Sequence, residues 1–372
     1  MKLLYLTHMR LPTEKAYGLQ MVNTCKAFAD KNVTVTLLLA HYPNAITQNI
    51  YHYYGFDEKK FLVVYFQLPY LWKNTKAGFW FHMLLFSKRC FLYTIKNRQQ
   101  TIYSREPLPL LFYSLLGYQT IYEMHDFPVN SHWFHGLVCR LATKVVVTNT
   151  WAKERCRLEY GLSEEKLILT PNGYDDKLFL TPVAKTKARQ ALAIPVDQKI
   201  VMYSGHLYDW KGVEIILALG AQRPDIQFMF VGGAKVDQAK LRLKYPDKNI
   251  SFIPHLPPGE VPLYLQAADI LVLPNIPINQ HSEFSTSPIK LFEYMAARRP
   301  VIASQLPSLV AVVSEQEVFF APAGDVAAWD DTIQTVFSNP VEVKKRVEAA
   351  ALLALNYTWD AKAATILKRL ST

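Results

Sequence analysis

Two residues of opposite charge follow a proline in the segment HSEFSTSPIKLFEYMAARRPVIA, residues 281–303. Ser287 and Pro288 match an N-cap followed by proline at the first helical position, so we expect a helix to begin here. Lys290 and Glu293 then fall three residues apart on one face of that helix. A helix start suits a phosphate, and a carboxylate can accept hydrogen bonds from the two hydroxyls of a ribose. The pattern indicates a nucleotide site; the alternative is a surface helix with a Lys–Glu pair.

The elements around this segment explain how it would be positioned. Two apolar runs, Ile270–Leu273 and Val301–Ala303, flank it and are typical of parallel strands. Short apolar runs alternate with longer helical patterns along the whole chain, which indicates parallel βαβ units in two open α/β sheets. Such sheets bind ligands at the carboxyl ends of their strands. The remaining expected strands are Leu3–Thr7, Val33–Leu39, Leu62–Phe66, Thr120–Tyr122, Val145–Thr148, Leu167–Leu169, Ile200–Tyr203, Gln227–Val231, Ile250–Ile253 and Val318–Phe320.

The length of 372 residues exceeds what one hydrophobic core usually supports. Two domains of roughly 170–190 residues are the natural expectation. Residues 180–196 hold two prolines around a basic helical pattern, and we place the domain junction near there. We therefore expect a first domain over residues 1–180 and a second over 181–355.

The composition is that of a globular protein, with 50% apolar and 19% charged residues. The four cysteines have no CxxC spacing, so we expect buried free thiols in a reducing compartment. The opening residues MKLLYLT are too short for a signal-peptide core and are expected to form the first strand. The most apolar long stretch, Ala77–Ile95, is interrupted by Lys88 and Arg89, so no membrane-spanning helix is expected. A cytoplasmic or peripheral protein follows from these features.

Charge is concentrated in residues 59–105, which we call the basic aromatic segment. It holds nine basic residues and no acidic one: Lys59, Lys60, Lys73, Lys76, Lys88, Arg89, Lys96, Arg98 and Arg105. Aromatic residues are interleaved, namely Tyr65, Phe66, Tyr70, Trp72, Phe79, Trp80, Phe81, Phe86, Phe91 and Tyr93. This mixture suits an anionic membrane surface, at about 1 kcal/mol for each Lys or Arg near it. The alternative is a pair of core helices with a solvated basic rim; nucleic acid is disfavoured because no recognition module accompanies the charge.

Several motifs follow one another in a recognisable order. They are RLPTEKAYGLQ, YSREP and YEMHD in the first half, then TPNGYDDKLF (170–179), YSGHLYDWKG (203–212), FIPHLPPGEVPLYLQAADILVLP (252–274), SPIKLFEYMA and NYTWDAKAATILKRL (356–370). This set resembles the retaining, GT-B-fold glycosyltransferases of the large family 4, or group 1, type. The resemblance implies two Rossmann-like doubly wound domains that face a central cleft. The first would bind the acceptor at a membrane, the second would bind a nucleotide sugar, and residues 356–372 would form a helix that crosses back to the first domain.

The resemblance implies catalytic roles for Lys211 and His206. A lysine at position 211 can balance the diphosphate charge that grows as the nucleotide leaves. Family members commonly have an arginine four to six residues earlier, where this chain has His206, which lacks the fixed charge and the five-donor fork of arginine. The donor-binding residues implied are Gly205, His255, Leu256, Ser285, Thr286, Ser287, Lys290 and Glu293.

One position departs from the family pattern. Relatives place a glutamate eight residues before the ribose-binding one, but counting back from Glu293 gives Ser285, with Glu283 two residues earlier. Either Glu283 takes that place, or the backbone N–H groups of Ser285, Thr286 and Ser287 hold the sugar and phosphate. We favour the backbone groups because this run is a good anion nest.

In the first half, Gly18 follows the first strand and its loop. A glycine lets the backbone approach a phosphate, although a simple helix-entry glycine is the alternative. Arg10, at the end of the first strand, would reach acceptor or phosphate, or else face solvent.

His125 follows an apolar run, and the resemblance implies that it points into the cleft as a catalytic residue that touches the donor sugar. A buried, hydrogen-bonded histidine is the alternative. Arg105 ends another strand and would contact the acceptor or pair with Glu106. Asn172, in a Pro-Asn-Gly turn, lies near the cleft floor in relatives.

No DxD triplet or HExxH motif is visible, so we expect neither a metal nor another cofactor. The resemblance implies a front-face route in which the leaving phosphate helps to deprotonate the acceptor hydroxyl. We expect transfer from a UDP- or GDP-sugar to a lipid-linked or polysaccharide acceptor in cell-surface glycan synthesis, at the inner face of the cell membrane. The alternatives are a nucleotide-sugar epimerase of the same fold and a non-catalytic glycan- or membrane-binding scaffold. The sequence leaves open the donor sugar, the base, the acceptor, the linkage and the oligomeric state.

Overall fold

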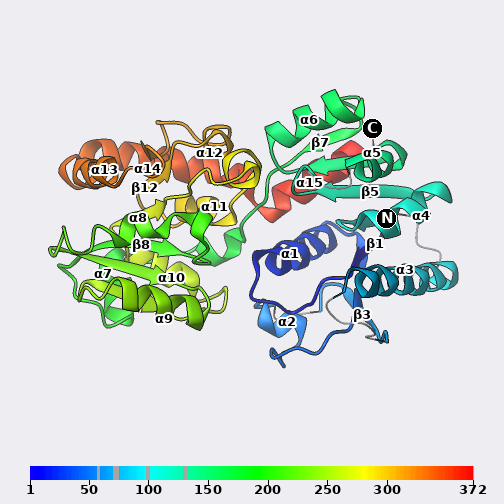
Figure 1. The fold of residues 1–372 in the computed structure, drawn as a ribbon, viewed down its shortest axis with the longest axis horizontal. Coiled ribbons are helices and arrows are strands. Elements are labelled where there is room, and N and C mark those ends of the chain that lie inside the picture. Colours follow the sequence, from blue (N-terminus) through cyan, green and yellow to red (C-terminus); the bar gives the residue numbers. More distant parts are fainter. Residues whose placement is uncertain (57–58, 70–74, 98–100, 129–131, 372) are drawn as a thin grey trace. The chain divides into compact units, whose positions relative to one another are not determined.

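The computed structural model describes residues 1–56, 59–69, 75–97, 101–128 and 132–371 (Figure 1). The chain divides into two compact units. Unit 1 contains Met1–Asn172 and Trp359–Thr372, and unit 2 contains Gly173–Thr358. We describe each unit by itself.

The first boundary lies before position 180 and outside the proline-flanked stretch that we expected to hold the junction. Tyr174 and Phe179 pack in the core of unit 2, and the Tyr174 N–H donates to the Tyr357 carbonyl at 3.0 Å. Buried Arg189, in the same basic stretch, forms a 2.7 Å ion pair with Asp269. The residues after Asn172 are therefore part of a packed domain, and their basic composition does not mark a linker.

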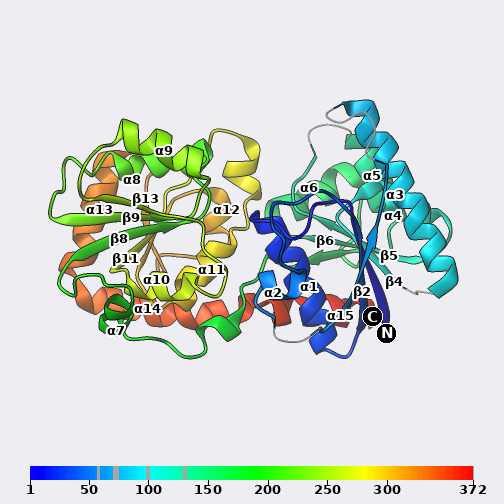
Figure 2. The ribbon, with the colours of Figure 1, turned by 90° about the horizontal axis from the view of Figure 1, so that it is seen from below.

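Unit 1 is built on a seven-stranded parallel sheet with the order β3-β2-β1-β4-β5-β6-β7. Figure 2 shows α1 and α15 on one side of this sheet and α3, α4 and α5 on the other. The strands are β1 (Lys2–Thr7), β2 (Thr34–Ala40), β3 (Leu62–Phe66), β4 (Thr101–Ser104), β5 (Gln119–Met124), β6 (Lys144–Val147) and β7 (Leu167–Leu169). The helices are α1 (Ala16–Asp30), α2 (Ile50–Tyr53), α3 (Lys76–Asn97), α4 (Pro107–Leu115), α5 (His132–Leu141), α6 (Thr150–Tyr160) and α15 (Trp359–Ser371).

Unit 2 repeats the winding in a six-stranded parallel sheet with the order β10-β9-β8-β11-β12-β13. Its strands are β8 (Lys199–Ser204), β9 (Ile226–Val231), β10 (Ile250–Ile253), β11 (Ile270–Leu273), β12 (Val301–Ser304) and β13 (Phe319–Ala321). Its helices are α7 (Lys185–Ala191), α8 (Val213–Leu217), α9 (Lys235–Lys244), α10 (Val261–Ala267), α11 (Ile289–Ala296), α12 (Pro307–Val310), α13 (Val326–Ser338) and α14 (Pro340–Ala354). The expectation of two doubly wound parallel sheets is confirmed.

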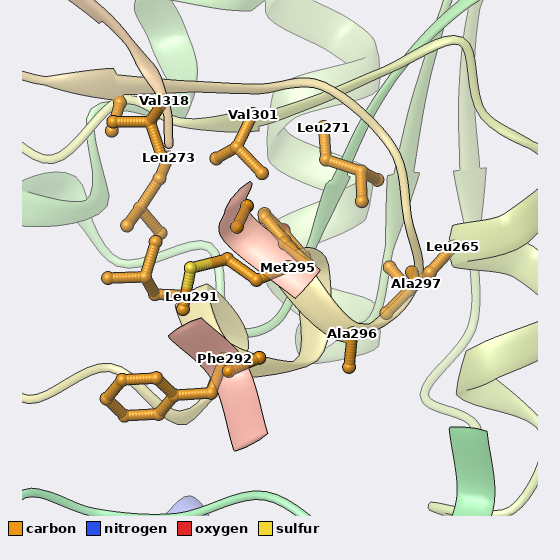
Figure 3. Packing of buried hydrophobic residues seen from close by; sticks show 14 of the residues in the cluster. Leu265, Leu271, Leu273, Leu291, Phe292, Met295, Ala296, Ala297, Val301 and Val318 are labelled. Carbon is orange, nitrogen blue, oxygen red and sulfur yellow. The ribbon is translucent and has the colours of Figure 1, made fainter. Parts of the chain in front are cut away.

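Both faces of the second sheet are packed, which fixes the direction of its side chains. Along β8, Ile200 and Met202 join one core cluster while Val201 and Tyr203 join another. This alternation follows from the two-residue period of a strand that is buried on both faces. Figure 3 shows α11 on the first of these clusters, with Leu291 and other apolar side chains beside those of the neighbouring strands. The apolar face of α11 therefore anchors the helix that carries Lys290 and Glu293.

Each sheet has one place where the strand order reverses. The reversal lies between β1 and β4 in unit 1 and between β8 and β11 in unit 2. Connections leave these adjacent strands toward opposite faces, so a crevice opens at their carboxyl ends, where doubly wound sheets bind ligands. We call each of these places a switch point.

Two further expectations concern the membrane and the thiols. Among the described residues, none of the helices combines the length and the apolarity required to traverse a bilayer. All four cysteines are buried free thiols, as the spacing indicated.

Candidate nucleotide-sugar site

Two glycines shape the loop that follows β8 at the switch point of unit 2. Gly205 has a φ of 125°, and its N–H donates to the Val231 carbonyl at 2.8 Å. Gly212 has a φ of 63°, and a Cβ built on it would lie 1.9 Å from the Pro274 carbonyl oxygen. Side chains rarely adopt either backbone conformation, and the second position also has no room for one. The glycines therefore let residues 205–212 lie directly against the end of β11.

Lys290 points its ammonium group at the first of these glycines. A Cβ built on Gly205 would lie 2.7 Å from Lys290 Nζ, and this Nζ lies 3.8 Å from the centroid of the Tyr203 ring. The Nζ atom is buried and has no hydrogen-bond partner among the described residues. Burial and the charge of Lys211 lower the pKa of Lys290 well below its usual value, while Glu293 opposes them. A buried ammonium without a hydrogen-bonded anion is costly, so the site favours an anionic ligand.

Lys211 supplies a second cation to the same region. It ends a short 3-10 turn, Asp209–Lys211, and its Nζ lies 3.4 Å from the centroid of the Trp210 ring. Burial lowers the pKa of Lys211 to about 7. Since Lys211 is one of the charges that lowers the pKa of Lys290, the two ammonium groups lie within electrostatic range of each other. Two neighbouring cations match the charge of a diphosphate.

Glu293 completes the constellation from one turn further along α11. Burial raises the pKa of this carboxyl to about 7, and Lys290 opposes the shift. The structure therefore brings Lys211, Lys290 and Glu293 into one electrostatic group. A carboxyl with a pKa near neutrality can become an ionised acceptor for two hydroxyl groups when a ligand compensates it.

The start of α11 differs from the expectation. The helix begins at Ile289, and Pro288 is its N-cap residue, with φ −76° and ψ 116° and without a side-chain cap. Assigning Ser287 as N-cap and Pro288 as the first helical residue was therefore wrong by one position. The backbone is still extended at Thr286, whose ψ is 130°, and this delays the helix.

The residues before α11 form a π-helical turn, His281–Ser285, which sequence reasoning missed. The Ser282 hydroxyl donates to the Asn279 carbonyl at 2.9 Å, and the Thr286 hydroxyl lies 2.9 Å from that of Ser308. Ser285 and Thr286 are buried, whereas Glu283 is half-buried within the turn. The Thr286 side chain is thus used inside the fold, which leaves its backbone N–H as its candidate group for ligand contact.

The remaining predicted donor residues lie in two places: His206 lies in the loop after β8, and His255 and Leu256 lie after β10. His206 directly follows Gly205, its ring stacks on Tyr208 at 4.9 Å, and its carbonyl accepts from the Tyr203 hydroxyl at 2.6 Å. His255 is exposed after the edge strand β10, two strands away from β8, and Leu256 packs against the core. His206 therefore belongs to the loop of the cation pair, whereas His255 and Leu256 follow the edge strand of the sheet.

In unit 1, His125 belongs to a buried polar group that we call the Glu123 cluster. Gln20 donates to both Glu123 carboxylate oxygens at 3.0 Å, and Arg105 donates to the Gln20 side-chain carbonyl at 2.9 Å. Lys362 Nζ and His125 Nε2 lie 2.8 and 3.1 Å from Glu123 Oε1. Burial alone would raise the pKa of Glu123, but Lys362 and His125 hold it well below its usual value. Burial, followed by the charge of Arg105, lowers the pKa of His125 to about 4.

Sequence reasoning placed His125 and Arg105 in a site but missed Glu123, Gln20 and Lys362. Glu123 stands two residues before His125 in YEMHD, which is a usable signal because alternate residues of a strand share a face. Lys362 is far away in sequence, and only the packing of α15 on α1 brings it near.

A second polar group at the carboxyl ends of β1 and β4 was also missed. His8 Nε2 lies 2.6 Å from His82 Nδ1 and 2.8 Å from the Tyr42 hydroxyl. Glu106 accepts from the His8 N–H at 2.9 Å and from the Thr7 hydroxyl at 3.2 Å. Glu106 therefore bonds to β1 residues, while Arg105 bonds to Gln20 in the Glu123 cluster.

The other predicted residues of unit 1 have structural partners. Arg10 donates to Glu14 at 2.7 Å on the surface. Gly18 lies inside the first turn of α1, and a Cβ built on it would lie 2.2 Å from the Tyr54 hydroxyl and 2.5 Å from a Thr13 methyl. The missing side chain of Gly18 is thus required by this packing. Asn172 is the last residue of unit 1 before the boundary.

The basic aromatic segment forms part of an exposed apolar surface. Tyr70, Trp72, Lys73 and Arg98 lie outside the described residues. Helix α4 packs against both α3 and α5, so the three helices lie side by side. They expose large apolar side chains, and Lys88 and Arg89 are exposed among them on α3. We call this the α3–α5 surface; its apolar members are Phe79, Trp80, Leu84, Leu92, Ile95, Phe112, Leu115, Leu116, Trp133, Leu137 and Leu141.

Two doubly wound parallel sheets in successive units define the GT-B class, and solved structures of that class match the whole chain. Sucrose-phosphate synthase from Thermosynechococcus elongatus has a TM-score of 0.80 and 19% identity, and covers 100% of this chain and 98% of its own. HepE from Anabaena, in complex with UDP, has a TM-score of 0.75 and 17% identity, with 100% of both chains covered.

The sequence comparison then shows a family similarity for part of the chain. Residues 184–352, most of unit 2, match the family Glycosyl transferases group 1. D-inositol 3-phosphate glycosyltransferase from Acidothermus cellulolyticus is 25% identical over 233 residues, which are 58% of this chain and 50% of the relative. The matched region therefore spans about half the length of this relative. The similarity to the group 1 glycosyltransferases therefore covers most of unit 2, and the solved structures share the fold of the whole chain.

Proposed function

We propose that the protein is a retaining glycosyltransferase that moves a sugar from a nucleotide-sugar donor to a lipid-linked or polysaccharide acceptor. The observation that carries this proposal is the pair of cations, Lys211 and Lys290, beside Glu293 at the switch point of unit 2. The Lys290 ammonium group has no hydrogen-bond partner among the described residues, which is the state expected of a site that awaits a diphosphate. The solved relative HepE binds UDP, which supports a UDP-sugar as donor, and a GDP-sugar is the alternative.

The roles of the residues follow from their charges. Glu293 would accept from the ribose hydroxyls, and Lys211 and Lys290 would contact the diphosphate, with His206 as an additional donor. When the bond between the sugar and the phosphate breaks, negative charge grows on the diphosphate, and Lys211 and Lys290 in their protonated forms stabilise it without reorganisation. The positive charge of these two lysines supports transfer without a resident metal ion. The departing phosphate oxygen would take the proton of the acceptor hydroxyl while the acceptor oxygen bonds to the anomeric carbon of the sugar. Attack on the face from which the phosphate leaves keeps the anomeric configuration.

The direct test measures transfer from radiolabelled UDP- and GDP-sugars to acceptors in a membrane extract. We expect Lys211→Ala to lower the rate about 100-fold or more, the usual cost of losing one charge-stabilising donor. The matched control is Lys235→Ala, an exposed lysine of the same unit. Equal labelling by wild type and Lys211→Ala would remove Lys211 from the mechanism.

Two further arms separate the other functions. NMR of the donor without acceptor would reveal a changed sugar if the protein were an epimerase. Calorimetry with UDP would give no heat if it were a scaffold without a nucleotide site. Transfer that requires an acceptor, together with measurable UDP binding, supports the proposal over both.

We also propose that the α3–α5 surface binds an anionic membrane, which would place the protein at the inner face of the cell membrane. Exposed aromatic side chains such as Trp80 and Trp133 beside Lys88 and Arg89 support this. Liposome co-sedimentation tests it: Lys88→Glu with Arg89→Glu should weaken binding, and raised salt should have the same effect. Reversal of two exposed lysines of α14, Lys344→Glu with Lys345→Glu, is the control. Binding that is insensitive to both salt and charge reversal would refute electrostatic anchoring.

A further inference from the structure

The last helix carries a charged side chain into the interior of unit 1. Lys362, on α15, places its Nζ 2.8 Å from Glu123 Oε1 on β5, and the two side chains are 2% and 0% exposed. Such a pair is tolerated only because each charge compensates the other, and removing one leaves the other buried and unpaired. The ionised state of Glu123 therefore depends on a residue that is 239 positions away in sequence.

A second base competes for the same carboxylate oxygen. His125 Nε2 lies 3.1 Å from Glu123 Oε1, the atom that Lys362 also approaches. An imidazole beside an uncompensated carboxylate gains a proton and becomes an imidazolium, whereas one beside a neutralised carboxylate stays neutral. The ammonium of Lys362 neutralises the Glu123 carboxylate, which a protonated His125 would otherwise do.

The other groups that face the pair add to this effect. Arg105, at the end of β4, bonds to Gln20 of α1, whose amide donates to both Glu123 oxygens. The hydroxyls of Tyr5 on β1 and Tyr103 on β4 are buried nearby, and burial raises the pKa of each, so both are neutral. The cluster thus contains one carboxylate and two permanent cations, which leaves no charge for His125 to balance.

We propose that Lys362 is a positioning residue for His125. It keeps Glu123 paired, so that His125 remains a neutral imidazole at the carboxyl end of β5, able to exchange hydrogen bonds with a sugar hydroxyl. Only the last step, contact between His125 and the sugar, rests on the proposed function. In this way the returning helix adds to burial and to Arg105 in keeping a candidate catalytic residue neutral.

NMR of protein labelled with 15N-histidine tests the charge effect without any assay of activity. In wild type, His125 should stay neutral down to about pH 4. In Lys362→Met, the pKa of His125 should rise above its wild-type value, since Glu123 loses its ammonium partner and the imidazole is the remaining group that can supply a positive charge to the same oxygen. The His125→Gln spectrum assigns the signal.

Matched variants separate this role from a purely structural one. Lys368→Met, on the exposed side of the same helix, should leave the His125 titration unchanged. The double variant Glu123→Gln with Lys362→Met should return His125 to the neutral form because both charges are gone. If Lys362→Met does not fold, Lys362→Gln makes the same prediction, because its amide can bond to Glu123 but carries no charge. If the folded Lys362 variant, whether Lys362→Met or Lys362→Gln, titrates at His125 as wild type does, the proposal is overturned.

The transfer assay then links the charge state to activity. In Lys362→Met, the transfer rate at saturating nucleotide sugar should increase with pH through the raised pKa of His125. Wild type at the same saturation should lack this limb between about pH 5 and 8, because the pH dependence of donor binding no longer enters the rate. A wild type without transfer would refute the proposed function and leave the NMR result standing. A raised His125 pKa with an unchanged pH–rate profile would overturn the step from charge to catalysis.

Discussion

The two sheets have the same winding, yet the charges at their switch points are arranged in opposite ways. In unit 2, Lys211 and Lys290 lie near each other, and neither forms a described ion pair. In unit 1, Glu106 accepts hydrogen bonds from Thr7 and His8. Glu123 accepts from Gln20 and forms an ion pair with Lys362. The first arrangement leaves positive charge unmatched, whereas the second matches negative charge internally.

This difference bears on the kind of ligand that would suit each site. A protein tolerates a buried unmatched charge only at a cost in stability, and a bound counter-ion offsets that cost. A buried carboxylate that already has an ammonium and an amide as partners gains little from a further ion. Unit 2 is therefore suited to an anion such as a diphosphate, and unit 1 to a neutral ligand that offers hydroxyl groups.

The most demanding test of this comparison is Lys290→Met, which removes an unmatched charge and keeps the volume. We expect UDP affinity to fall about 10- to 100-fold, the worth of one charge-assisted hydrogen bond. Without ligand, the variant should unfold at a higher temperature than wild type, because a buried unpaired ammonium is gone. Calorimetry and thermal unfolding check the two expectations, with Lys235→Met as the exposed control. A variant that is destabilised without ligand would show that Lys290 is already compensated.

The pH dependence of donor affinity should show a maximum near neutrality. Lys211 has a pKa of about 7, so phosphate binding weakens as pH rises above that value and the ammonium loses its proton. Glu293 also has a pKa of about 7, so ribose binding weakens as pH falls below it and the carboxylate gains a proton. Each limb approaches a tenfold change per pH unit, or about 1.4 kcal/mol.

Two variants assign these limbs in calorimetric titrations with UDP-glucose. Glu293→Gln should flatten the acidic limb and leave the alkaline one, and Lys211→Met should do the reverse. A profile that is flat in wild type would contradict the electrostatic grouping of the two residues.

Much of the fold follows from sequence pattern, and the exceptions have physical causes. Strands such as β3, β7, β10 and β11 have the predicted bounds because short, mostly apolar runs between longer helical patterns identify the parallel strands of an α/β sheet. For β4, the sequence placed Arg105 at a strand end but gave no bounds for that strand, because Thr101–Ser104 has four residues and one aliphatic side chain. Its place beside β1 comes from the sheet and not from its own pattern.

The candidate site of unit 2 was more predictable than that of unit 1. Lys290 and Glu293 are three residues apart on one short helix, so local spacing is enough to place them together. The Glu123 cluster instead joins residues from α1, β5 and α15, and His8 meets His82 across 74 positions. Such contacts depend on tertiary packing, which a single sequence does not display.

A smaller effect is expected from Gly205→Ala, which sharpens the comparison by moving one cation. The new methyl would lie 2.7 Å from Lys290 Nζ and force the ammonium aside. The control is Gly324→Ala, at a φ of 87° with nothing within 4 Å of its Cβ. Both variants should lose about 1 kcal/mol of stability from backbone strain. Only Gly205→Ala should also lower UDP affinity, by a few-fold, and equal UDP affinities in the two variants would mean that the position of Lys290 is unimportant.

The smallest effect is expected from Arg10→Met in unit 1. Arg10 pairs with Glu14 four residues along the chain, and both side chains are partly exposed. Such a pair contributes about 0.3–0.5 kcal/mol, so unfolding should change little. UDP affinity should stay at the wild-type value, because the unmatched cations lie in unit 2. If Arg10 contacts the acceptor, the KM for acceptor rises while the affinity for UDP is unchanged. A loss of UDP affinity would instead mean that unit 1 also supplies charge to the anion. The contrast between the two switch points would then fail.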